Sequence, residues 1–342
     1  MMRSLPATIG NRVLPRQNGA AWFVVVAALL GGGAAFGGYY GWYVVVNAIV
    51  TGSMWALVAL SLALVFGIMQ IPSFAIGEYF MAGAVTSYFV FHNLSSLGSA
   101  SAGWMLPLIA IAAGVIVGAL LGVVTDLAIL RPLRRRAGSN WIVRTFVVTI
   151  GISVLLQNGE EVAFGPNYYG VSQWWSGGVE ILGVRVTSDS IASTAIGLAA
   201  IAFVSWFLKR TRLGLRMRAV SDDEVGASLQ AIPISLVHLM SYTMSCALAA
   251  LAGGVLLFLF PASPTVGAEP LLLAWIVIVI SGLGSVAGAA ICAYVVALLN
   301  GVTDQVFGPQ WESLVLVVLI IAVLLIWPRG LFGTRESGLW ME

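Results

Sequence analysis

Residues 66–78 read FGIMQIPSFAIGE, a short polar interruption between two long apolar runs. Pro72 has no backbone N–H donor and Gly67 is a weak helix former, so a helix that reaches this stretch is expected to end in it. The hydrocarbon core of a membrane offers no partner for the backbone groups that such a break frees. Interrupted membrane helices therefore occur where they face protein or a water-filled cavity, and this stretch predicts such a break.

A second interruption, Gly282-Leu283-Gly284-Ser285, separates the apolar runs 271–281 and 286–302. The first of these runs would rise only about 16 Å as a helix, which is less than the hydrocarbon core of about 30 Å. We expect either a half-helix that turns back inside the bilayer or a short crossing. Each half of the chain then contains one broken hairpin.

The composition is that of an integral membrane protein. Of the 342 residues, 60% are hydrophobic and 9% are charged, and the mean hydropathy is +0.99. A soluble domain has about 25% charged residues. We predict an all-α integral membrane protein with about ten transmembrane or re-entrant helices, because each such helix needs about 20 apolar residues. The predicted segments are 21–36, 43–66, 75–91, 105–128, 142–159, 190–208, 235–260, 271–281, 286–302 and 312–327.

Basic residues give the expected orientation, because Lys and Arg are retained on the cytoplasmic side. All but Arg185 fall in four clusters, near residues 3–16, 131–144, 209–218 and 329–335. If the chain reverses direction at both breaks, an even number of membrane crossings separates each basic cluster from the next. We expect a cytoplasmic tail over 1–20, a transmembrane domain over 21–328, a cytoplasmic tail over 329–342 and both termini in the cytoplasm.

Several classes of site are excluded by the motifs. A phosphate-binding Gly-x-x-x-x-Gly-Lys-Ser/Thr loop does not occur, and Lys209 is the only lysine. The spacing Gly282-x-Gly284-x-x-Ala287 fits a dinucleotide fingerprint, but apolar membrane segments flank it instead of a βαβ unit. The two Cys and two His lack metal-binding spacing. With a net charge of +2, nucleic acid binding has no support either. We therefore expect no catalytic residue, metal or cofactor in this chain.

Polar side chains around the two breaks form a candidate translocation pathway. They are Gln70, Ser73 and Glu78 at the first break, and Ser281 and Ser285 at the second. An unpaired carboxylate inside a membrane is energetically costly, so a carboxylate found there is a functional candidate by default. This favours Glu78 as a pathway residue. The alternatives are that Glu78 stabilises the positive end of a helix dipole and that the serines only satisfy broken backbone.

A short polar segment after the third basic cluster predicts a helix outside the bilayer. Ser221 and Glu224 have the spacing of a capping box, so we expect a helix from Asp222 to Ile232, ended by Pro233. It would lie on the bilayer or dock in the groove of a partner. Its candidate contact residues are Asp222, Asp223, Glu224, Val225, Leu229 and Ile232.

The longest predicted external loop runs from Gly165 to Ser188 and holds Tyr168, Tyr169, Trp174 and Trp175. Aromatic residues are enriched both at membrane interfaces and at protein docking sites. The loop therefore indicates either an interfacial belt or a docking surface.

A set of motifs between residues 47 and 333 carries a family resemblance. The motifs are Asn47-x-x-x-x-Gly52-Ser53-Met54-Trp55-Ala56-Leu57, Val65-Phe66-Gly67-Ile68, Phe74-Ala75-x-Gly77-Glu78, Thr211-Arg212-Leu213-Gly214, Ala249-Ala250-Leu251-Ala252-Gly253, Ser281-Gly282-Leu283-Gly284-Ser285 and Trp327-Pro328-Arg329-Gly330-Leu331-Phe332-Gly333. In this order they resemble the membrane subunits of Liv-type branched-chain amino acid importers of the ATP-binding-cassette class. The Phe-Ala-x-Gly-Glu form is similar to the H-type permease subunit.

The resemblance implies a fold and a set of partners. It implies a permease of about ten helices in a prokaryotic inner membrane, two cytoplasmic ATPase subunits that bind ATP, a second permease subunit (an M-type partner or a second copy) and an extracytoplasmic solute-binding protein. It further implies alternating access, in which the ATPases act on the helix from Asp222 to Ile232 as a coupling helix.

Two departures from the family pattern bear on substrate and coupling. The family usually has Asn-Phe-Ala-His-Gly-Glu where this chain has Ser73 and Ile76, and Leu-x-Gly-Ile-Asn where it has Leu229 to Pro233.

Two rival functions follow from the residues. One is a proton-coupled secondary transporter with Glu78, Glu160 or Glu161 as proton carriers, and the other is a passive urea or amide channel.

Overall fold

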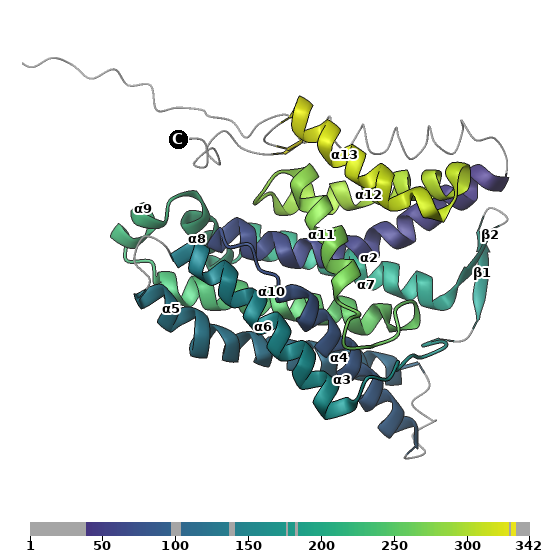
Figure 1. Ribbon diagram of the computed structural model, residues 1–342, viewed down its shortest axis with the longest axis horizontal. Coiled ribbons are helices and arrows are strands. Elements are labelled where there is room, and N and C mark those ends of the chain that lie inside the picture. The colour runs from purple at the N-terminus through teal and green to yellow at the C-terminus, as the bar shows by residue number, and fades with distance from the viewer. Residues whose placement is uncertain are drawn as a thin grey trace, which may run out of the picture.

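A computed structural model describes residues 39–96, 104–136, 141–175, 177–181, 184–327 and 330–332. Long helices run side by side along the long axis of the molecule (Figure 1). The α-helices are α2 (Tyr39–Met69), α3 (Ile76–Ser96), α4 (Leu106–Thr125), α5 (Arg131–Arg136), α6 (Trp141–Phe164), α7 (Ser188–Arg210), α8 (Arg212–Asp222), α9 (Glu224–Leu229), α10 (Ile234–Val255), α11 (Ala268–Ser281), α12 (Val286–Phe307) and α13 (Glu312–Ile326). A π-helical turn, η2 (Asp126–Leu130), joins α4 to α5.

Within the described residues, each apolar run predicted from 43–66 onward coincides with a helix. Seven of these helices are long and apolar enough to cross a membrane, and α11, at 14 residues, is shorter, as its sequence indicated. The predicted segment 21–36 lies outside the described residues. The structure therefore confirms a helical membrane fold, whereas the count of about ten helices is not confirmed.

One element departs from the all-α prediction. Strands β1 (Gly178–Ile181) and β2 (Val184–Thr187) form an antiparallel hairpin in the predicted external loop. The hairpin lies at the end of the molecule opposite α8 and α9 (Figure 1). Each strand has only four residues, too few for alternation to stand out in a chain this apolar.

The centre of the fold is formed by α2 and α10. In both helices 72% of the most apolar segment is buried, and α2 contacts α7, α10, α11 and α12. Small residues bring α3 and α10 together, because a Cβ atom on Gly83 would overlap the backbone of Ala250 and one on Gly253 would overlap the carbonyl of Phe80. Close helix approach through small residues is typical of membrane proteins. It gives the Ala249 to Gly253 motif a physical role.

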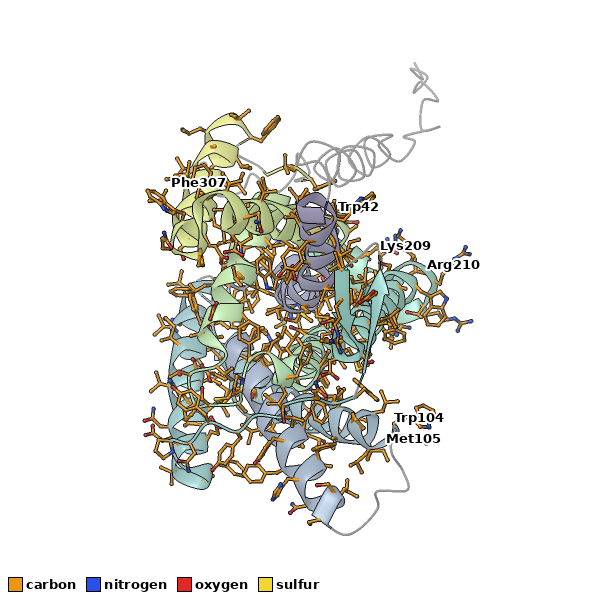
Figure 2. All side chains as sticks on the ribbon, turned by 90° about the vertical axis from the view of Figure 1, so that its right-hand side faces the viewer. Trp42, Trp104, Met105, Lys209, Arg210 and Phe307 are labelled. Atoms are coloured by element: carbon orange, nitrogen blue, oxygen red, sulfur yellow. The ribbon has the colours of Figure 1, made fainter. Side chains whose placement is uncertain are left out.

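By contrast, α6 and α13 are almost uncovered, with only 11% of the most apolar part of each buried. Both lie on the same side of the bundle, at the left of Figure 2, where α6 is teal and α13 is yellow. An apolar face of this kind must contact lipid or another protein.

Candidate translocation site

The first break is the non-helical segment 70–75 between α2 and α3. Gln70 adopts the left-handed conformation with φ = 53°, and its N–H donates to the carbonyl of Phe66 at 3.0 Å. This is the geometry of a helix C-terminus, where glycine is the usual residue. Pro72 follows two residues later, which prevents the helix from continuing. The predicted interruption is therefore confirmed, with Gln70 exposed and Ser73 fully buried.

The second break is the reversal at residues 282–285 between α11 and α12. Gly282 and Gly284 have φ values of 94° and 92°, which other residues rarely adopt. The Oγ of Ser285 accepts from the N–H of Gly288 at 3.1 Å and so caps α12. Ser281 is buried, and its Oγ donates to the carbonyl of Ile278 at 3.0 Å. Both serines thus satisfy broken backbone, as the alternative interpretation expects.

The two breaks meet in the structure. A Cβ atom on Gly67 would lie 2.9 Å from the carbonyl oxygen of Gly284, and one on Gly77 would lie 2.7 Å from that of Gly267. The half-helix α11 therefore runs along the first break from one end to the other. Two interruptions more than 200 residues apart in the sequence form one junction.

Aromatic rings fill the space around this junction. Phe74, inside the first break, stacks on Trp275 of α11 with ring centroids 5.5 Å apart and meets Phe146 of α6 edge-on at 5.5 Å. Trp275 also contacts Phe66, near the end of α2. Sequence reasoning missed this cluster, because nothing in the local sequence of Trp275 or Phe146 points to the break.

A buried carboxylate pair lies on the seam between α3 and α6. Glu78 is 8% exposed, and its Oε1 accepts from the Oγ of Ser153 at 2.7 Å. Glu160, two turns further along α6, is also 8% exposed. Among the described residues neither carboxylate oxygen of Glu160, nor Oε2 of Glu78, has a hydrogen-bond partner. Ser153 was missed, although its seven-residue spacing from Glu160 places both on one face of α6.

The helix that the sequence predicted outside the bilayer differs from the prediction in its bounds and its cap. α8 continues through Asp222, and a separate helix α9 begins at Glu224. The N-cap of α9 is Asp223, whose Oδ1 accepts from the N–H of Gly226 at 2.9 Å. Thr211 caps α8 instead, so Ser221 lies inside a helical turn and cannot serve as an N-cap. The predicted helix from Asp222 to Ile232 is therefore wrong in both bounds.

Ser221 has a different contact. Its Oγ donates to the carbonyl oxygen of Gly67 at 2.5 Å. In an unbroken helix the N–H of Ile71 would bond this carbonyl, so Ser221 satisfies an acceptor that the first break sets free. The hydroxyl therefore ties the helices α8 and α9, called the α8–α9 pair below, to the end of α2.

The apolar residues of α9 do not form one stripe. Val225 and Leu229 are exposed, Leu229 by 83%, whereas Ile232 follows the helix and packs against the core. Asp222, Asp223 and Glu224 are exposed as well. Although Glu224 is exposed as a whole residue, its carboxyl group is partly buried, and this burial raises the pKa of Glu224. The guanidinium of Arg134 opposes this shift.

The predicted external loop is partly packed against the helices. Trp174 is buried against Phe91, and the N–H groups of Trp174 and Trp175 both donate to Oδ1 of Asp189, at 3.1 and 2.7 Å. Neither the belt nor the docking interpretation fits Trp174, because a buried ring reaches neither lipid nor a partner. Tyr168 is exposed.

The chain is similar in sequence to known permease proteins. LivH, the high-affinity branched-chain amino acid transport system permease protein of Escherichia coli K12, is 26% identical over 298 residues, covering 85% of this chain and 94% of LivH. BraD of Pseudomonas aeruginosa, a permease protein with the same description, is 28% identical over 297 residues, covering 85% and 95%. A chain of PsaBC from Streptococcus pneumoniae, solved with a Fab, aligns with a TM-score of 0.42 at 14% identity, over 89% of this chain and 97% of that one.

The family described as branched-chain amino acid transport system / permease component matches residues 44–324, a range that includes both breaks, Glu78, Glu160 and the α8–α9 pair. Members of this family are transport subunits and lack an ATPase activity of their own. On this match, the chain belongs to the branched-chain amino acid permease family of ATP-binding-cassette importers.

Proposed function

We propose that this chain is the permease subunit of an ATP-driven importer for branched-chain amino acids or similar small polar solutes. Its partners are two ATPase subunits, a second permease subunit and an extracytoplasmic solute-binding protein. ATP is bound by the ATPases, and this chain carries no cofactor. The transmembrane permease domain covers 21–328, and the tails 1–20 and 329–342 lie in the cytoplasm of a prokaryotic cell.

The observation that carries this proposal is the bond from Ser221 to the carbonyl of Gly67. An importer of this type must pass a movement of its ATPases to its membrane helices. α9 presents Leu229 and Val225 outward, where an ATPase groove can hold them. A pull on α9 reaches α8 directly and the end of α2 through Ser221. The first break is the point at which α2 can move relative to α3 without losing helical hydrogen bonds.

The route for the solute is proposed to follow the seam between α3 and α6, beside this break. An amino acid carries an ammonium group, and the unpartnered oxygens of Glu78 and Glu160 are acceptors for such a cation. Gln70, Ser73, Ser281 and Ser285 surround the inner end of this route. The exposed faces of α6 and α13 are then the surfaces that a second permease would cover, so that α6 separates the route from the second subunit.

The carboxylates also favour a second candidate, a proton-coupled transporter. Buried carboxylates with unpartnered oxygens, such as Glu78 and Glu160, are typical proton-relay groups in membranes. The two functions differ in energy source. An importer depends on the ATPases and is indifferent to a proton gradient, whereas a secondary transporter shows the opposite dependence.

The test is uptake by the assembled complex in liposomes, with the binding protein outside and ATP at the ATPases. Leucine, isoleucine, valine, urea and acetamide are supplied in turn. We expect leucine-class solutes to stimulate ATP hydrolysis and to accumulate only with ATP. Uptake that survives inactive ATPases and disappears with a proton ionophore would establish the secondary transporter instead. Equilibration of urea without any energy source would indicate a channel.

A further inference from the structure

The lipid-facing side of α4 leads to two arginines. The exposed apolar residues of α4 and η2 recur every three or four positions and so form one face of the helix. These residues are Ile116, Leu120, Val124 and Leu127. The same spacing continues to Arg131 and Arg135 at the start and end of α5. The two guanidinium groups therefore lie where a face in contact with lipid tails reaches the edge of the membrane.

Two adjoining pockets open at this point, and they share Leu127 and Arg131. The outer one has a volume of about 420 Å³ and is lined by Leu127, Arg131, Pro132 and Arg135. The inner one, of about 210 Å³, lies between η2 and the start of α10 and is lined by Asp126, Leu127, Arg131, Pro233, Ser235, Leu236 and Leu239. Two arginines therefore border the outer pocket, and three of the seven residues that line the inner one are leucines.

The local carboxylate forms its ion pair with a third arginine, Arg134, and interacts only at longer range with Arg131. Asp126 is fully buried and pairs with Arg134, whose Nη2 lies 2.5 Å from Oδ1. The Nε of Arg131 is buried and has no hydrogen-bond partner among the described residues. The lining contributed by α10 carries no charged side chain, and the N-terminus of that helix adds a partial positive charge. The outer pocket is therefore set up for an anion.

We propose that the phosphodiester of an anionic membrane phospholipid binds between Arg131 and Arg135. Planar guanidinium groups recognise phosphate oxygens through paired hydrogen bonds. The acyl chains would lie along Leu127 and the exposed Leu236, in line with the apolar stripe of α4. Basic pockets between helices at the membrane edge are known sites for such headgroups. A soluble phosphate shares this chemistry but would gain nothing from the leucines.

The site is next to the proposed ATPase contact. Arg134 pairs with Asp126, and its charge also acts on the carboxyl group of Glu224 in α9. A bound headgroup would therefore hold α5, and with it this charge, in place. This makes the lipid a structural component of the end of the bundle that carries α5, α8 and α9 (Figure 1).

The experiment measures lipid retention by the purified full-length chain, using native mass spectrometry and thermal unfolding. The protein is titrated with phosphatidylglycerol or phosphatidylcholine of the same acyl chains, and separately with inorganic phosphate. We expect preferential binding of phosphatidylglycerol. Arg131→Gln or Arg135→Gln should weaken it about fivefold, and the double variant about 25-fold. Arg131→Lys and Arg135→Lys, which keep the charge but lose the paired hydrogen bonds, should weaken binding less than the Gln variants do.

Arg210→Gln is the matched control, because Arg210 is an exposed arginine at the end of another membrane helix, and its side chain points away from the bundle (Figure 2). It should bind phosphatidylglycerol like the unchanged protein. Equal retention of both lipids, or full competition by millimolar inorganic phosphate, would overturn the proposal. Unchanged lipid binding in the Arg131 and Arg135 double variant, with loss of ATPase co-purification, would assign the arginines to the protein partner instead.

Discussion

The first and second breaks meet at one junction, yet different parts of the chain hold them. At the first break, the freed carbonyl of Gly67 is bonded by a single side chain, the hydroxyl of Ser221. At the second, the carbonyls of Ile280 and Ser281 accept from the backbone N–H groups of Leu331 and Phe332, at 2.9 and 2.8 Å. One break is thus tied to a helix pair at one end of the bundle, and the other is held by the backbone that follows α13.

This difference assigns the two breaks different roles. A single side-chain bond to the α8–α9 pair can transmit a displacement, and it can be exchanged without unfolding the junction. Two backbone hydrogen bonds, together with the Ser285 cap, hold the second break in a fixed position. We expect α2 and the first break to move against α11 and the second break during transport.

The largest effect is expected when the proposed contact between α9 and an ATPase, which would move the first break, is removed. Replacing Leu229 with Asp places a charge on the exposed apolar residue of α9 that we expect an ATPase groove to bury, and an unpaired buried charge is costly. Co-purification of the ATPases should fall below detection, with normal membrane abundance of the permease. Ser228→Asp, also on α9 and exposed, is the control. Normal uptake by the Leu229 variant would remove α9 from the coupling path.

Glu78→Gln tests whether the moving side of the junction handles the solute. The amide keeps the size of the side chain and can still accept from Ser153, but it loses the charge that would attract an ammonium group. We expect uptake of leucine to fall at least tenfold, on the order of 1.4 kcal/mol or more of lost transition-state binding, while basal ATP hydrolysis persists. Glu161→Gln, at an exposed position of α6, should transport normally. Equal uptake by both variants would leave Glu78 with only a helix-dipole role.

A smaller loss is expected for Ser221→Ala, which cuts the bond to Gly67. A hydrogen bond of this kind contributes about 0.5–1.5 kcal/mol, so the amount of leucine imported per ATP hydrolysed should fall severalfold, with the complex intact. Ser221→Thr retains the hydroxyl and should restore coupling. Ser228→Ala, whose lost bond stays within α9, is the comparison variant. An unchanged ratio in Ser221→Ala would mean that the contact is only structural.

The smallest effect is expected at the second break, which we expect not to move during transport. Ser285→Ala removes the N-cap of α12 and should lower unfolding stability by about 1 kcal/mol, measured as a small decrease in melting temperature. Because the second break does not move in this account, leucine imported per ATP should stay at the level of the unchanged protein. A coupling defect as large as that of Ser221→Ala would contradict the distinction between the two breaks.

The sequence was sufficient for most helices and for both breaks, because membrane helices follow from apolar length and breaks from Pro72, Gly282 and Gly284. It was insufficient where the answer depends on a distant partner. Ser221 and Asp223 are both good N-cap residues, and only the position of Gly67, 154 residues away, shows which task Ser221 performs. The same holds for Ser153 and Trp275. The roles of Gln70, Ser73, Ser281 and Ser285 in a pathway stay predictions.

Labelling at the two breaks tests most directly whether the first break moves during transport while the second stays fixed. Gln70→Cys and Leu283→Cys place a thiol at an exposed position of the first and second break, and the native Cys246 and Cys292 are buried, so background reaction is low. Each complex is reacted with a soluble maleimide, with and without ATP and vanadate to trap the closed ATPases. We predict that trapping changes the labelling rate at Gln70→Cys several times more than at Leu283→Cys, and that adding Ser221→Ala removes this difference. Equal changes at both breaks, or none at the first, would contradict the account.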